Sequence, residues 1–133
     1  MGVRLTKDSI DLGIVVSDPE RSLAFYRDAL GFKDDGTMPM PGGATMYRLY
    51  CGTSLIKLVH YPKELPSPPP GGIHKALGYR YWTISVDNIA EVVDACEVAG
   101  HKIAVPVTEI RPGVRIAIIE DPDGNWVELV SYA

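Results

Sequence analysis

The order strand, helix, hairpin is written twice along this chain of 133 residues, and this repeat limits the possible folds more than any other feature of the sequence. In the first copy, a β-branched run at residues 10–16 precedes Ser17-Asp18-Pro19-Glu20. That tetrapeptide supplies a helix N-cap, a proline in the first helical turn and an acidic side chain at the positive end of the helix dipole. We therefore predict a strand followed by a helix that begins at Pro19 and ends at Gly31.

The rest of the first copy is expected to form a hairpin. Residues 36–43 are rich in glycine and proline, which predicts a loop. Residues 45–51 and 54–61 have the composition of strands, and the turn Cys51-Gly52-Thr53-Ser54 joins them.

The second copy follows a connector at residues 62–78, whose many prolines and glycines exclude a helix or a central strand. Residues 81–86 are strand-like, Asp87 is the expected N-cap, and an apolar stripe predicts a helix that ends at Gly100. The expected strands after it are residues 102–109, 114–119 and 126–132, the last two joined by Asp121-Pro122-Asp123-Gly124.

The two copies agree in register, because Asp11 precedes Lys57 by 46 positions and Tyr81 precedes Glu128 by 47. We therefore predict an α+β fold built from two β-α-β-β-β modules in a single domain that spans residues 1–133. Module one covers about residues 8–61 and module two about residues 79–133. Neither small sheet can bury both faces alone, so the modules must pair within the chain or across a dimer.

The composition of the chain limits the classes of binding partner that we expect. The chain is 46% hydrophobic and carries a formal net charge of −4, which argues against a nucleic-acid or anionic-membrane partner, because both require a basic face. No apolar run approaches the roughly 18 residues that span a bilayer. Two cysteines are too few for a disulfide framework, and the N-terminus lacks the pattern of a signal peptide, so we expect a cytoplasmic protein.

Two motifs resemble those of the vicinal oxygen chelate superfamily, which includes glyoxalase I, bleomycin-resistance proteins, extradiol dioxygenases and methylmalonyl-CoA epimerase. The first runs from Ser17 to Tyr26 and continues as Leu30-Gly31-Phe32, and the second is Asp121-Pro122-Asp123-Gly124-Asn125-Trp126-Val127-Glu128-Leu129. The resemblance implies that the modules form curved sheets around one cavity, often in a homodimer, with a divalent metal among four inward side chains.

Carried over by position, the resemblance places the four metal-ligand positions at Asp11, Lys57, Tyr81 and Glu128, and only Glu128 keeps the customary residue type. A protonated lysine has no lone pair and cannot bind a metal, so we expect no metal and no other cofactor. The Lys57 ammonium would supply part of the charge of the missing cation. A hard ion held by Asp11, Tyr81 and Glu128 is the route to metal binding that stays open.

Strand alternation extends the predicted cavity around these four residues. The resulting chamber is apolar and aromatic, with a few polar groups, which suits a small hydrophobic or aromatic ligand. An arginine near the last hairpin could bind a ligand carboxylate. The predicted ligand-binding residues are Val59, Tyr61, Thr83, Trp126, Tyr132 and Arg115.

Several functions fit this pattern. The first is a metal-independent isomerase or lyase in which Lys57 acts as acid, base or stabiliser of an oxyanion, with Asp11 or Glu128 as the complementary base and Tyr81 as a hydroxyl donor. Another is a non-catalytic protein that sequesters its ligand, and a third is a metal-dependent enzyme resembling glyoxalases or dioxygenases. A purely structural ion pair between Lys57 and a carboxylate is the plainest alternative.

Overall fold

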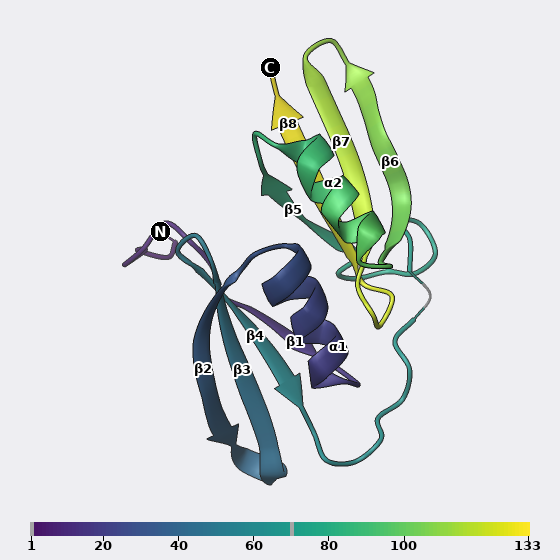
Figure 1. The fold of residues 1–133 in the computed structure, drawn as a ribbon. Helices are drawn as coiled ribbons and strands as arrows, with labels where there is room; N and C mark the ends of the chain where they lie inside the picture. Colours follow the sequence, from purple (N-terminus) through teal and green to yellow (C-terminus); the bar gives the residue numbers. More distant parts are fainter. Residues whose placement is uncertain (1, 70) are drawn as a thin grey trace.

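The computed structural model describes residues 2–69 and 71–133 and contains two four-stranded sheets, with strand orders β1-β4-β3-β2 and β5-β8-β7-β6 (Figure 1). In each sheet the first two strands in that order are parallel and the remaining neighbours are antiparallel. The two predicted β-α-β-β-β modules with curved sheets are confirmed. Pro70, in the predicted connector, and Met1 lie outside the described residues.

Module one contains six elements and a short 3-10 turn at Pro41–Gly43. Its helix begins at Pro19 as predicted, because the Asp18 carboxylate accepts hydrogen bonds from the backbone nitrogens of Glu20 (3.1 Å) and Arg21 (3.3 Å). The elements are β1 (Leu12–Val15), α1 (Pro19–Leu23), the π-helical turn η1 (Ala24–Ala29), β2 (Lys33–Met40), β3 (Ala44–Cys51) and β4 (Ser54–His60).

The predicted loop at residues 36–43 is wrong, since most of it belongs to β2. This strand lies at the edge of its sheet, where the missing N–H of Pro39 disrupts no inner ladder. The pairing of β2 with β3 shifts register between Asp34 and Thr37, and Gly36 takes a φ of +85° at that irregularity. This edge strand with a bulge thus contains the glycine and proline that are typical of a loop.

Module two repeats the arrangement, with β5 (Tyr81–Ser85), α2 (Ile89–Val98), β6 (Lys102–Arg111), β7 (Val114–Glu120) and β8 (Trp126–Tyr132). The N-cap position of α2 is Asn88 rather than the predicted Asp87, and the Asn88 side chain donates to Glu91 (3.2 Å) instead of capping the backbone. The described part of the connector has neither helix nor strand, as predicted. None of the described helices is long and apolar enough to cross a membrane.

Both modules share one hydrophobic core. Each helix packs on one face of its own sheet, and η1 also contacts α2 (Figure 1). Ile56 and Leu58 of β4 and Val127 and Leu129 of β8 belong to this single cluster. Because side chains alternate along a strand, Lys57 and Glu128 each point to the side of their own sheet that faces away from this core. We call these sides the first open face (Lys57) and the second open face (Glu128).

Candidate functional site

The first open face joins two of the predicted site residues, Lys57 and Asp11. The Lys57 Nζ atom lies 3.8 Å from Asp11 Oδ2, and Lys7 Nζ lies 2.6 Å from Asp11 Oδ1. The hydrogen bond from Lys7 is the main cause that lowers the pKa of the Asp11 carboxyl, and the charges of both lysines act in the same direction. One ionised carboxylate is therefore shared between two ammonium groups, which leaves Lys57 only partly neutralised.

Arg48 of β3 also belongs to the first open face, and our sequence analysis missed it. It is the direct cross-strand partner of Lys57, and its Nε donates to Asp35 Oδ2 at 3.2 Å. The sequence did indicate the position of Arg48, because the tight turn after Cys51 pairs Cys51 with Ser54. Counting outward from that pair places Arg48 opposite Lys57.

The second open face holds Glu128 and Tyr81. Thr83 donates from Oγ1 to Glu128 Oε1 at 2.8 Å, and the two residues are cross-strand partners. Tyr81 pairs with Trp126 one row away and is 46% exposed. The cross-strand partner of Glu128 on β7 is Ile118, and that of Trp126 is Glu120, so this face carries a second carboxylate one row from Glu128.

The other predicted ligand-binding residues divide between the two sides of the sheets. Val59 lies on the first open face, and Tyr132 ends the row of alternate β8 residues that includes Glu128. Tyr61 follows β4, with its ring beside Gly42. Arg115 pairs with Ser131, which places it on the side of the sheet away from Glu128. Among the described residues, no hydrogen bond or ion pair joins Asp11 and Lys57 to Tyr81 and Glu128.

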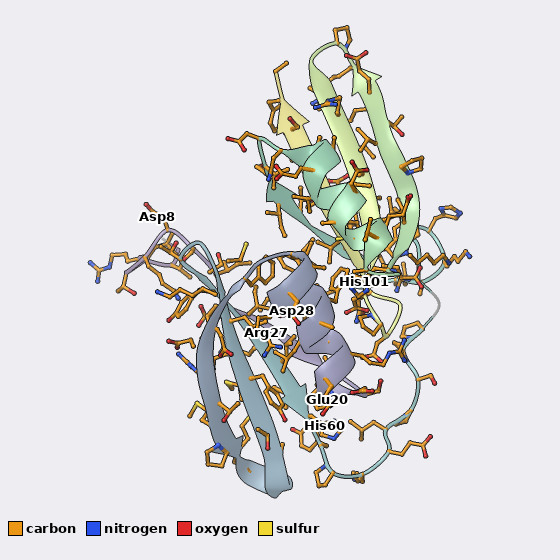
Figure 2. The ribbon with its side chains drawn as sticks, in the orientation of Figure 1. Asp8, Glu20, Arg27, Asp28, His60 and His101 are labelled. Carbon is orange, nitrogen blue, oxygen red and sulfur yellow. The ribbon has the colours of Figure 1, made fainter. Side chains whose placement is uncertain are left out.

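A surface pocket with a volume of about 360 Å³ lies at the junction of the modules. Figure 2 shows His101 at the end of α2 that faces module one, where its ring meets that of Phe25 with a centroid distance of 5.0 Å. Lys102 lies 3.5 Å from Glu120, which also accepts from Trp126 Nε1 at 3.3 Å. Within this pocket, the Lys102 ammonium and the Glu120 carboxylate thus form an ion pair with each other.

The donors on the open faces do not suit a divalent cation. The Lys57 ammonium offers no lone pair, and Asp11 directly precedes β1 of one sheet, whereas Glu128 lies on β8 of the other. In residues 2–69 and 71–133, no three side chains of His, Cys, Asp or Glu gather in a way that could hold a metal ion. The chemistry available on the open faces is that of fixed charges and hydroxyl groups.

Comparison with known proteins gives a consistent result. Residues 9–129 match the family described as the Glyoxalase/Bleomycin resistance protein/Dioxygenase superfamily. The chain is 34% identical over 128 residues to a lactoylglutathione lyase from Schizosaccharomyces pombe, covering 86% of this chain and 42% of that protein. It is 33% identical over 85 residues to a mitochondrial methylmalonyl-CoA epimerase from Mus musculus, covering 62% and 47%. The chain therefore spans less than half the length of these relatives.

Solved structures resemble the fold over its whole length. A glyoxalase family protein from Bacillus cereus superposes with a TM-score of 0.82 at 19% identity, covering 98% of this chain and 96% of that one. TnmS3, an antibiotic binding protein from Streptomyces, superposes with a TM-score of 0.72 at 19% identity, covering 98% and 100%. At these identities the structures establish the fold alone.

Proposed function

This chain belongs to the Glyoxalase/Bleomycin resistance protein/Dioxygenase superfamily. On that premise we propose that it binds a small, partly apolar molecule, without a metal, in a cavity formed by a first open face and a second open face. The observation that carries the proposal is the Lys57 ammonium, held 3.8 Å from Asp11 on the first open face. Lys57 provides a fixed positive charge at the position where the family resemblance implies a cation. Its side chain is 33% exposed, so a bound molecule can reach it.

A second copy of the chain closes the cavity. The open faces point away from the shared core, so one chain alone leaves each of them uncovered. Large apolar side chains on these faces are strongly exposed in the single chain: Val15 (53%), Met38 (44%), Tyr81 (46%) and Tyr132 (64%). In the proposed homodimer, the first open face of one copy lies over the second open face of its partner.

In this cavity the protein acts as an isomerase or lyase. Glu128 takes a proton from a carbon next to a carbonyl group, and the Lys57 ammonium stabilises the negative charge that develops on the carbonyl oxygen. The hydrogen bond from Thr83 holds one oxygen of the Glu128 carboxylate, which orients the other. Tyr81 is the nearby hydroxyl donor. Asp11 holds the Lys57 ammonium in place through their ion pair at 3.8 Å.

Sequestration without chemistry is the second candidate function. It is favoured by the apolar and aromatic side chains that lie near Glu128 on the second open face, Tyr81, Trp126 and Ile118, and by the fold shared with an antibiotic binding protein. The two free cysteines, Cys51 and Cys96, suit a reducing cytoplasm for either function.

Proton exchange separates the two functions. A panel of 2-oxo acids and acyl thioesters is incubated with the protein in D₂O, and loss of the signal from the carbon-bound proton is followed by ¹H NMR. An isomerase or lyase exchanges that proton, and Lys57→Met and Glu128→Gln abolish the exchange. Lys63→Met, which removes an exposed lysine of the connector, leaves it unchanged. Saturable binding with no exchange in wild type would contradict the enzymatic proposal and support sequestration.

A further inference from the structure

Two cationic side chains stand directly opposite each other on the first open face. Arg48 and Lys57 are cross-strand partners in the antiparallel pair β3·β4, so their Cβ atoms are about 4.5–5.5 Å apart. Like charges at such a distance destabilise a sheet. Nothing in the hairpin itself requires this pair, since a polar uncharged residue at either position would serve the strand equally well.

The neighbouring carboxylates offset only part of this charge. Asp11 and Asp35 border the pair, the first near Lys57 and the second bound to Arg48 Nε. Asp11 is nearer to Lys7 than to Lys57. Within this group, Lys7, Lys57 and Arg48 face two carboxylates, Asp11 and Asp35, so the cations outnumber the carboxylates by one. The surplus is local, because the whole chain carries a net charge of −4.

Arg48 has donors left over for a ligand. Its Nε is used by Asp35, and its Nη1 lies 4.0 Å from the sulfur of Met38, a weak acceptor. The side chain is 27% exposed, and that of Lys57 is 33% exposed. Arg48 is thus hydrogen-bonded to one carboxylate and Lys57 is ion-paired with another, and the remaining N–H groups of both are accessible to a molecule on the open face.

We infer that the molecule bound at the proposed site carries an oxyanion, a carboxylate or a phosphate, which Arg48 and Lys57 hold together. The planar guanidinium matches the two oxygens of such a group, and the ammonium adds a second charge-assisted contact. The rest of the ligand packs on the second open face, where Glu128 stands opposite Ile118. The inference rests on the proposed function and names its substrate class: amphipathic organic acids or phosphate esters.

Two fluorescent probes test this inference, since they share a ring system and differ in one charged group. 8-Anilinonaphthalene-1-sulfonate carries an oxyanion, and N-phenyl-1-naphthylamine lacks it. Arg48→Met and Lys57→Met should each weaken binding of the sulfonate about tenfold, the loss of roughly one charge-assisted contact, and change binding of the neutral probe less than about twofold. Lys63→Met, the matched control in the connector, should change neither.

Further measurements separate the possible causes. Arg48→Lys keeps the charge but loses the planar fork, so it should weaken sulfonate binding less than Arg48→Met does. This variant also guards against a folding defect, which urea unfolding of each variant would reveal. Displacement of the sulfonate by hexanoate, hexyl phosphate and hexanol distinguishes a carboxylate from a phosphate, and hexanol should displace it least.

The outcomes are distinguishable. If Arg48→Met weakens both probes equally, or neither, the oxyanion inference is wrong while an apolar binding site stands. If hexanol competes as well as the two anions, the inference is likewise overturned. If neither probe binds to the wild-type protein in a saturable way, the proposed function fails and the inference fails with it.

Discussion

Tyr26 of η1 donates a 2.6 Å hydrogen bond to Oδ2 of Asp121, 95 positions away in the turn between β7 and β8. Both residues are buried. Asp121 also accepts from the backbone nitrogens of Asp123 and Asn125 at 3.0 and 2.8 Å. The neighbouring Asp123 accepts from the backbone and the hydroxyl of Ser17. The turn of module two is therefore bonded to η1 and to Ser17, the residue before the N-cap of α1.

Removing the Tyr26 hydroxyl should loosen this junction. Tyr26→Phe leaves the buried Asp121 carboxylate without one of its donors, so we expect a loss of about 1–3 kcal/mol in the free energy of unfolding. Urea denaturation measures it. The control is Tyr47→Phe, because the Tyr47 hydroxyl has no hydrogen bond among the residues that the structure describes. Equal effects of the two substitutions would show that the bond to Asp121 contributes nothing.

The same hydrogen bond should make stability depend on alkaline pH. Burial, and then the charge of Asp121, raise the pKa of Tyr26 well above 10.0. The unfolded chain loses the tyrosine proton near pH 10 while the folded chain keeps it, so unfolding releases a proton and stability falls as pH rises above that value. Since Tyr26→Phe lacks this proton, the stability advantage of wild type over the variant should shrink above pH 10. Urea titrations of both proteins across that range test it, and a constant advantage would contradict the account.

The two cysteines should differ in reactivity. Burial raises the pKa of the Cys96 thiol to about 11, and it raises the pKa of Cys51 as well. Cys96 is fully buried on α2, whereas Cys51 is partly exposed. Under native conditions near neutral pH, iodoacetamide should label Cys51 slowly and Cys96 only at the rate of unfolding, as mass spectrometry of peptides can follow. Native labelling of Cys96 as fast as of Cys51 would mean that α2 opens locally.

The proposed dimer makes a prediction about mass. Sedimentation equilibrium should give twice the mass of the chain, with a dissociation that depends on protein concentration. Val15→Asp should yield monomers that remain folded, because Val15 is 53% exposed in the single chain and lies on the first open face. Val98→Asp is the matched control on α2, where the side chain is 89% exposed. A monomeric wild type, or equal effects of the two variants, would argue against the dimer.

Much of the fold could be predicted because its signals are local. The cap at Asp18 and the glycine at position 31 mark the ends of one helix, and the turn after Cys51 marks a hairpin. Strand β2 was not predicted, because Gly36 and Pro39 are typical of loops. Both residues are tolerated here because β2 is an edge strand with a bulge. It forms a strand because it pairs with β3, and the local sequence pattern of β2 gives no sign of that pairing.

The candidate site was predicted in part for the same reason. Alternation along β4 and β8 correctly separates Lys57 and Glu128 from the core positions beside them. Placing Arg115 required the pairing of β7 with β8, which sets it opposite Ser131 and away from Glu128. How the two open faces lie relative to each other depends on contacts between the modules, and a sequence pattern confined to one strand carries no information about those contacts.

A crystal structure of the protein with 8-anilinonaphthalene-1-sulfonate tests the central claim most directly. The account predicts the sulfonate within hydrogen-bonding distance of both Lys57 Nζ and the Arg48 guanidinium, with the rings covered by the second open face of another copy. Density for the probe in the junction pocket beside His101 and Lys102, with Lys57 extended into solvent, would contradict it.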